Sequence, residues 1–196
     1  KNNSENPVIC VPSGNFGNIC AGILAHHRGL PVEHFIAACN VNDVVPEYLR
    51  TEILQPKETV ATISNAMDVG DPSNFVRILE LFDKEFNQVK NKLSGYTIDD
   101  EETLKTIERV EKDYGYVLDP HGAVAFVALE KYLAENGGKG FFLETAHPVK
   151  FPDSVEKATG KSVEIPKSLE ELMKQGKFTT EINPQYEELK EFLLKK

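Results

Sequence analysis

The first forty residues carry the pattern that most constrains the fold. The run VICVP, at 8–12, is short, apolar and β-branched, and it ends at Ser13 and Gly14, as a buried strand that leads into a tight turn does. Apolar residues then recur at helical spacing over 17–28, before Gly29 and Pro31. HFIAAC, at 34–39, reads as a second buried strand. A strand, a helix and a strand in this order predict a βαβ unit with parallel strands.

The same alternation continues along the chain. The sequence predicts helices over 73–90, 99–113 and 119–135, the last capped by Asp119, and a strand over 140–145. The polar segment 51–59 predicts a loop, and the tail from 151 predicts short helices between Pro and Gly breaks. We therefore expect an α/β fold over 1–196, with a three-layer, doubly wound parallel sheet rather than two independent domains. With only three or four convincing strands, the sheet is expected to be incomplete.

Charge and composition exclude several classes of protein. A formal net charge of -9 disfavours a nucleic-acid-binding protein, which needs clustered basic residues. No apolar run is long enough to cross a membrane and the N-terminus lacks a signal-peptide pattern, so a cytoplasmic protein is expected. Cys10, Cys20 and Cys39 lack CxxC spacing and predict buried thiols rather than disulfides or a zinc site. Because adjacent side chains on a helix point about 100° apart, His26 and His27 do not predict a metal site.

The segment between the first strand and its helix has the most chemical content. It consists of Ser13, Gly14, Asn15, Phe16, Gly17 and Asn18. Backbone N–H groups at the start of a helix, together with the helix dipole, attract an anion such as a phosphate, and glycine lets that anion approach the backbone. The segment fits neither GxGxxG nor GxxxxGK[ST], which disfavours NAD and ATP. A glycine-containing turn with no ligand has the same spacing, so spacing alone leaves both interpretations open.

The order of the residues adds a resemblance. VPSGNFGN resembles the loop that binds the phosphate of pyridoxal 5'-phosphate (PLP) in threonine synthase, a fold-type II PLP enzyme of the tryptophan-synthase β-subunit class. The likeness continues in the family's order through AGILAHHRGLPVEHFIAACNVNDVVPEYL, SNAMDVGDPSNFVR, DPHGAVAF and ETAHPVKFPDSVE. The resemblance implies an enzyme that converts O-phospho-L-homoserine and water to L-threonine and phosphate with PLP as its cofactor.

The same resemblance implies roles for individual residues. The PLP phosphate is expected on the backbone of residues 14–18, and the Thr145 hydroxyl is expected to face the pyridine nitrogen, where it tunes how much charge the ring accepts. The Schiff-base lysine of the family lies in a Ser-Phe-Lys-Asp type segment upstream of the loop, and these 196 residues contain no such segment. We therefore expect the C-terminal part of the enzyme, with the lysine-bearing N-terminal part as its missing partner and no turnover alone. Lys139 and Lys150 are interpreted as surface residues.

Several further residues are candidates for substrate contact. Ser64, Asn65 and Asp68 either contact the substrate phosphate or organise a turn, and Arg77 is the basic type that a phosphorylated substrate requires. His147 lies two residues from Thr145 and either lines the site or forms a pocket wall. The alternatives to threonine synthase are a non-catalytic phosphate-binding module and another fold-type II lyase, such as a serine or threonine dehydratase. An incomplete sheet would also expose an unpaired edge, which predicts self-association.

Overall fold

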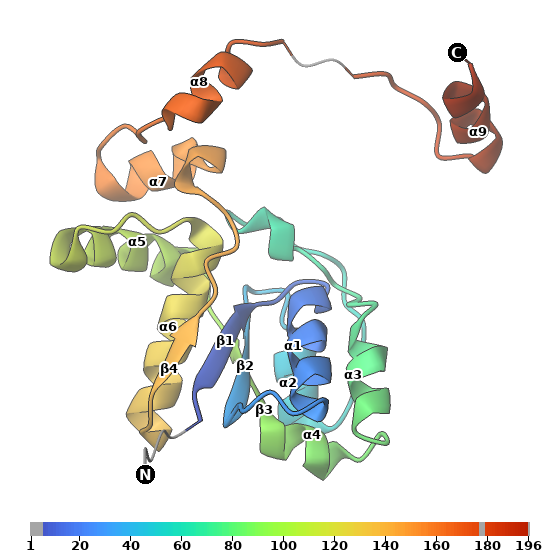
Figure 1. Ribbon diagram of the computed structural model, residues 1–196, viewed down its shortest axis with the longest axis vertical. Coiled ribbons are helices and arrows are strands. Elements are labelled where there is room, and N and C mark those ends of the chain that lie inside the picture. The colour runs from blue at the N-terminus through green and yellow to red at the C-terminus, as the bar shows by residue number, and fades with distance from the viewer. Residues whose placement is uncertain (1–5, 177–178, 196) are drawn as a thin grey trace. The chain divides into compact units, whose positions relative to one another are not determined.

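The computed structural model describes residues 6–176 and 179–195. A parallel sheet of four strands lies at its centre in the order β3-β2-β1-β4 (Figure 1). The strands are β1 (Val8–Pro12), β2 (His34–Cys39), β3 (Leu93–Thr97) and β4 (Gly140–Phe142). The α-helices are α1 (Gly17–His27), α2 (Val44–Thr51), α3 (Phe75–Leu81), α4 (Phe86–Lys92), α5 (Asp100–Tyr114), α6 (Pro120–Asn136), α7 (Pro152–Thr159), α8 (Lys167–Met173) and α9 (Tyr186–Leu194). Two 3-10 helices, η1 (Asn65–Met67) and η2 (Pro148–Lys150), complete the list.

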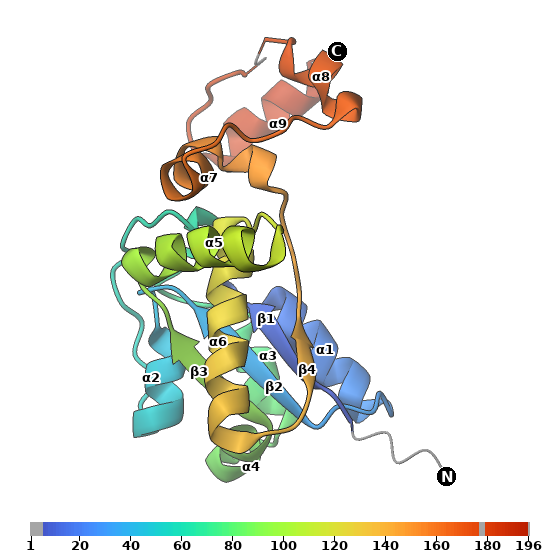
Figure 2. The ribbon, with the colours of Figure 1, turned by 90° about the vertical axis from the view of Figure 1, so that its left-hand side faces the viewer.

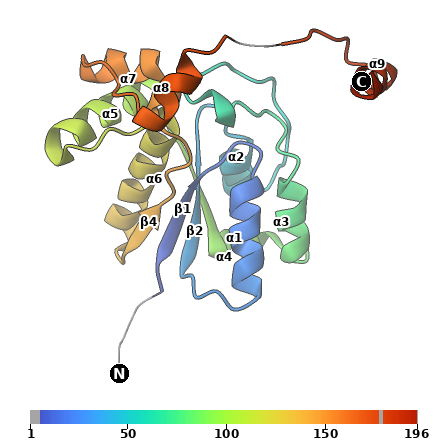
Figure 3. The ribbon, with the colours of Figure 1, turned by 45° about the horizontal axis from the view of Figure 1, so that its top comes forward.

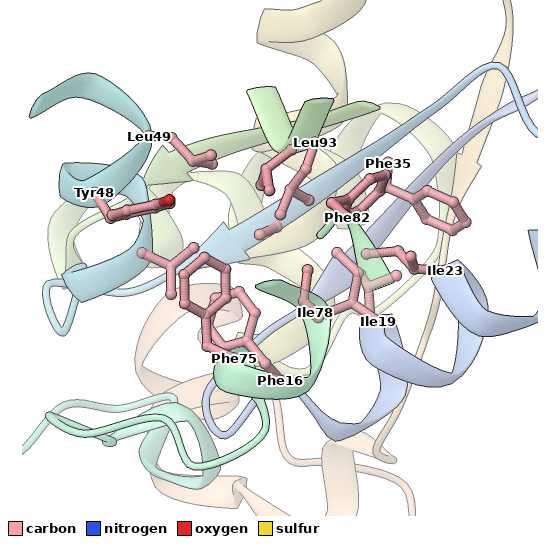
Figure 4. Packing of buried hydrophobic residues seen from close by; sticks show 14 of the residues in the cluster. Phe16, Ile19, Ile23, Phe35, Tyr48, Leu49, Phe75, Ile78, Phe82 and Leu93 are labelled. Atoms are coloured by element: carbon pink, nitrogen blue, oxygen red, sulfur yellow. The ribbon is translucent and has the colours of Figure 1, made fainter. Parts of the chain in front are cut away.

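Apolar side chains cover both faces of the sheet, which confirms the expected three-layer α/β fold. Successive residues of a strand point to opposite faces. Phe35 and Ala37 of β2 pack in a core with α1 to α4, whereas Ile36 and Ala38 pack in a second core with α6. Figure 4 shows the first core, and Figure 2 shows α6 on one side of the strands and α1 on the other. Side chains buried on both faces explain why β2 has no polar alternation.

The region between β2 and α5 differs most from the prediction. The single helix predicted over 73–90 is wrong: α3 ends at Leu81, and α4 begins at Phe86. Asp83 and Lys84 between them have φ of 52° and 61°, a left-handed conformation that ends a helix. The sequence pattern did not predict α2 or β3. Gly95 lets α2 pack closely on β3, because a Cβ there would lie 2.8 Å from the Cα of Pro46.

Most other elements are confirmed. The predicted strands at 8–12 and 34–39, the helix from 17 and the helices after Asp99 and Asp119 are all present, and the predicted loop at 51–59 is present except for Thr51, which ends α2. Asp99 and Asp119 each cap their helix, accepting from the N–H groups of Glu102 (2.8 Å) and His121 (2.9 Å). The strand predicted over 140–145 ends at Phe142, and the residues after it run into the site described below.

The three cysteines are free thiols: Cys10 and Cys39 are buried, and Cys20 is half-buried. Burial raises the pKa of the Cys10 and Cys39 thiols, which keeps both protonated.

The chain divides into two compact units, Lys1–Val163 and Glu164–Lys196, whereas the sequence pattern predicts one layered fold. The first unit contains the sheet and the cores. The second contains α8 and α9, whose short amphipathic segments leave Leu193 and Leu194 exposed. Within the described ranges, the structure has no helix of the length and apolar character needed to span a membrane.

Candidate functional site

A pocket of about 300 Å³ opens where β1 ends. In an open α/β sheet, ligands bind outside the carboxyl ends of the strands, at the point where the strand order reverses. Here β1 connects through α1 to β2 on one side, while β4 pairs with β1 on the other side. The starts of α1 and α6 and the chain after β4 lie at this end of the sheet (Figure 3). The pocket is lined by Pro12, Gly14, Asn15, Phe16, Gly17, Asn18, Ala66, Met67, His121 and Thr145.

The loop from Gly14 to Asn18 forms one wall of this pocket. Phe16 adopts a left-handed conformation (φ 62°, ψ 17°), which turns the chain from the loop into α1. Its side chain is buried against Phe75, with ring centroids 5.7 Å apart, and this packing stabilises the uncommon backbone conformation. The first hydrogen bond within α1 runs from the Cys20 N–H to the Phe16 carbonyl (3.1 Å). The N–H groups of the three residues before Cys20 therefore have no acceptor within the helix and suit an anion.

The loop is held from the side by the start of α3. Asn15 Oδ1 accepts hydrogen bonds from the backbone N–H (2.7 Å) and the hydroxyl (3.0 Å) of Ser73. The Asn74 side chain donates to the backbone carbonyl of Asn15 (2.9 Å). The side-chain oxygen and the backbone carbonyl oxygen of Asn15 thus both accept hydrogen bonds from the residues before α3. These two oxygens, which would repel a phosphate, are therefore paired with donors.

The two glycines of the loop serve different purposes. A Cβ on Gly14 would lie 2.6 Å from the Cα of Met67, so only glycine allows this close backbone approach. A Cβ on Gly17 would meet only the Asn74 side chain, at 3.7 Å. Gly17 is therefore not required by packing, and the space that its side chain would fill stays open to a bound group.

The opposite wall contains a buried hydrogen-bonded group. His121 Nδ1 lies 2.7 Å from Asp119 Oδ1, and the backbone N–H of Ala66 donates to His121 Nε2 (3.2 Å). Because a backbone N–H can only donate, Nε2 is the acceptor, and the ring proton resides on Nδ1 and is donated to Asp119. The Phe151 ring lies 4.8 Å from the imidazole, centroid to centroid. The ring of His121 is thus fixed as a neutral tautomer.

The structure brings together most of the residues predicted to bind the cofactor. Residues 14–18 and Thr145 line the same pocket, although Thr145 is more than 125 residues further along the chain, and His121 joins them. Ser13 does not line the pocket: it is buried, and its hydroxyl donates to the Val11 carbonyl (2.8 Å). The hydroxyl of Ser13 therefore stabilises the end of β1.

Ser64 and Asp68 belong to a polar network beneath the pocket. Asp68 Oδ1 accepts from Asn40 Nδ2 (2.8 Å) and from the Thr62 hydroxyl (2.7 Å). Asn40 Nδ2 also donates to the Ser64 hydroxyl (3.1 Å). Of the two interpretations of these residues, this network supports the organisation of a turn. It holds the following 3-10 helix, and hence Ala66, against the loop.

The other predicted substrate residues lie outside the pocket lining. Asn65 is exposed on η1, and Arg77 is exposed on α3. His147 is exposed and caps η2, where its Nδ1 accepts from the Val149 N–H (3.2 Å). The rings of His26 and His27 pack against Phe35 and Phe82, consistent with structural roles. A role of Asn65, Arg77 and His147 in substrate contact remains a prediction.

The sequence did not point to Ala66 and Met67, which line the pocket, or to Glu144, which precedes a lining residue. The block SNAMDVG contains the first two, and Glu144 immediately precedes Thr145. The sequence predicted that Gly14 lets an anion approach the backbone, whereas in the structure the close approach at Gly14 is to the backbone of Met67. Its partner in that approach, Met67, was visible only in three dimensions.

Comparisons with known proteins agree with this geometry. A family model described as pyridoxal-phosphate dependent enzyme matches residues 3–141, and one described as threonine synthase, C-terminal, matches 122–193. Threonine synthase of Buchnera aphidicola from Schizaphis graminum is 45% identical over 98% of this chain, and that of Escherichia coli is 49% identical over 84%. The chain covers 44% and 38% of these two relatives, so it spans less than half of their length.

Solved structures give the same result. The crystal structure of threonine synthase from Escherichia coli matches with a TM-score of 0.87 and 43% identity, covering 96% of this chain and 44% of that one. PLP-bound threonine synthase from Brucella melitensis matches with a TM-score of 0.86 and 29% identity, covering 98% and 46%. A threonine deaminase from Solanum lycopersicum, at 14% identity and a TM-score of 0.55, shares the fold alone.

The pocket and the comparisons point to one cofactor. The open space at Gly17, the N–H groups at the start of α1 and the committed acceptors of Asn15 fit the phosphate of PLP. The chain belongs to the family of pyridoxal-phosphate dependent enzymes and, within it, is similar to the C-terminal portion of threonine synthases.

Proposed function

We propose that this chain forms the phosphate-binding side of the active site of a threonine synthase, which converts O-phospho-L-homoserine and water to L-threonine and phosphate. One observation carries the proposal: the loop 14–18 and Thr145, which are distant in sequence, line one pocket at the carboxyl end of β1. Relatives named threonine synthase, at 40–49% identity, support this activity over a dehydratase or a non-catalytic module.

Within this proposal, the loop binds and orients the cofactor. The N–H groups at the start of α1 hold the phosphate, and Gly17 leaves room for it. The Thr145 hydroxyl is a neutral partner for the pyridine nitrogen, so that nitrogen does not gain a full proton as it would beside a carboxylate. When bound, PLP supplies an electron sink for the carbon atoms of an amino acid substrate. The protein contributes position and charge rather than the electron sink itself.

We further propose that the lysine that binds PLP covalently comes from outside these 196 residues. The ten residues that line the pocket include no lysine. Lys139 immediately precedes β4, Lys150 ends η2, and neither residue lines the pocket. In addition, the chain covers less than half of each relative compared above. The chain alone is therefore expected to bind the cofactor weakly and to make no threonine.

A titration with PLP tests the binding role of the loop. We expect PLP to bind more tightly than pyridoxal, which has no phosphate, and inorganic phosphate to compete. Gly17→Glu places a carboxylate in the first turn of α1 and should abolish the preference for PLP over pyridoxal. Ala21→Glu places the same charge on the exposed surface one turn later and is the control. Equal PLP affinity in these two variants would contradict the assigned phosphate site.

Reduction with borohydride tests the origin of the lysine. We expect no covalent attachment of PLP to a specific lysine when the complex of PLP with this chain is reduced. We also expect no threonine from O-phospho-L-homoserine. Stoichiometric labelling of one lysine, found by mass spectrometry of peptides, would show that a lysine of this chain reaches the cofactor and would overturn this part of the proposal.

A further inference from the structure

One buried oxygen atom beside the pocket has no donor. Asp119 is fully buried at the start of α6, and its Oδ1 accepts from both the backbone N–H and the ring of His121. Its second oxygen, Oδ2, is also buried, and no donor reaches it among the residues that the structure describes. A buried carboxylate oxygen without a hydrogen bond is costly, so a proton is expected nearby.

The group next to this oxygen is a second carboxyl group. The Glu144 side chain lies over the first turn of α6, where a Cβ on Gly122 would overlap its carboxyl oxygens. Gly122 follows Asp119 by three residues, in the first turn of the helix that Asp119 caps, so the Glu144 and Asp119 carboxyl groups meet at the start of α6. Two carboxylates this close repel each other, and the contact is favourable only when one of them carries a proton.

We propose that Glu144 is protonated, donates its hydrogen to Asp119 Oδ2, and acts with Asp119 as a positioning pair for the neighbouring pocket residues. The hydrogen bonds then form a continuous chain: Glu144 donates to Asp119, the ring of His121 donates to Asp119, and Ala66 donates to His121. Both oxygens of Asp119 and both ring nitrogens of His121 then have a hydrogen-bond partner. The chain joins the segment after β4, the start of α6 and η1 across one side of the pocket.

The electrostatics of the pair agree with this arrangement. Although Glu144 as a residue is exposed, desolvation of its carboxyl end, followed by the hydrogen bond with Asp119 and the negative charge of Asp119, raises the pKa of Glu144 to about 9. Burial alone would raise the pKa of Asp119, but hydrogen bonds from His121 and Glu144 outweigh it and lower it to about 2. The titratable groups that face the pair in the described ranges are His121 on α6 and Tyr116 in the segment before α6, whose pKa is raised by burial and by both carboxyl groups.

Two consequences follow for the pocket. Because the Ala66 N–H donates to Nε2 while Asp119 accepts the proton on Nδ1, the His121 imidazole offers the pocket no positive charge. Because Glu144 is tied to the start of α6, the next residue, Thr145, is held at the pocket. The proton on Glu144 does not depend on the proposed function. The role of Thr145 toward the pyridine nitrogen does rest on the proposed function.

Nuclear magnetic resonance of the chain without ligand tests the proton. The carbon-13 shift of the Glu144 carboxyl should show an un-ionised acid at pH 7, and the nitrogen-15 shifts of His121 should show a neutral ring protonated on Nδ1. Glu144→Gln keeps a donor to Asp119 and should leave the His121 shifts unchanged. An ionised Glu144 at pH 7, or a His121 ring protonated on both nitrogens, would overturn the proposal.

Cofactor binding then tests the positioning role. Glu144→Ala removes the donor and should weaken PLP binding by about tenfold, the scale of one lost charge-assisted hydrogen bond. Glu144→Gln should restore the affinity to within about threefold, well under 1 kcal/mol. Equal affinity in wild type and Glu144→Ala would refute the positioning role. Failure of the wild type to prefer PLP over pyridoxal would instead refute the proposed function. It would not change the protonation of Glu144 and His121 measured by nuclear magnetic resonance.

Discussion

Gly14 and Gly17 lie three residues apart in the loop, but their surroundings differ. A side chain on Gly14 would meet the backbone of Met67, which cannot move aside as a flexible side chain can. A side chain on Gly17 would have free space. At the scale of single residues, the loop therefore needs one glycine for folding and the other for a ligand.

Substitution of each glycine by alanine separates these two needs. Gly14→Ala should lower the free energy of unfolding by about 1–3 kcal/mol, because it overpacks a rigid contact. Gly17→Ala should change it by no more than about 0.5 kcal/mol. Unfolding in urea measures both values. If the two variants proved equally stable, the close approach of Gly14 to Met67 would not hold.

The paired carboxyl groups predict how stability depends on pH. The pKa of Glu144 is raised, so between its unfolded value and about 9 the folded chain holds a proton that the unfolded chain releases. The contribution is complete below the unfolded pKa and is lost as the pH rises toward about 9. The slope for one proton is at most about 1.4 kcal/mol per pH unit, and because Glu144 is exposed, solvent screening reduces the total contribution.

Urea unfolding at several pH values between 5 and 9 measures this slope. Glu144→Gln cannot titrate and should flatten the dependence relative to the wild type. Glu108→Gln, which changes an exposed carboxyl on α5, is the control and should leave the slope as it is. A slope that persists in Glu144→Gln would assign the dependence to another group.

At the scale of elements, α3 links the hydrophobic core to the site. Ser73 and Asn74, which immediately precede α3, hold Asn15, and Phe75 of α3 packs against both Phe16 and Tyr48 (Figure 4). The break at Asp83 and Lys84 lets α3 and α4 pack separately on the sheet. A single straight helix over 73–90 could not do so, which is why the periodicity of the sequence was misleading there.

Removal of the Phe75 ring should affect stability strongly. Phe75→Ala should cost about 3–5 kcal/mol, because it leaves a cavity in a closed core. Val76→Ala, at the adjacent exposed position of α3, should cost no more than about 0.5 kcal/mol. If Phe75→Ala does not fold, Phe75→Leu should still show a measurable loss in a urea titration. Similar losses of unfolding free energy in the Phe75 and Val76 variants would contradict the assignment of Phe75 to the core.

At the scale of the whole chain, the sheet ends in two strands that are each paired on one side within the described residues. β3 pairs with β2, and β4 pairs with β1. Unpaired strand edges with apolar side chains promote association between copies. Phe141 on β4 is 46% exposed and adds an apolar side chain to one such edge.

The chain by itself should therefore associate as its concentration rises, and Phe141→Lys should reduce this association. Leu24→Lys is a matched control, because Leu24 is also 46% exposed but lies on α1 rather than on a strand. Analytical ultracentrifugation over a range of concentrations measures the effect. Equal association of the two variants would show that the edge of β4 is not the contact.

The sequence by itself determined the elements whose signals are local. The apolar runs of β1 and β2, the glycine-containing turn into α1 and the capping residues Asp99 and Asp119 each act within a few residues, so their outcome could be predicted. Only the tertiary structure decided which distant segments meet. It placed Thr145 opposite the loop, paired Asp119 with Glu144, and formed β3 from a short run that contains Gly95, because contacts between segments far apart in the chain outweigh local preference.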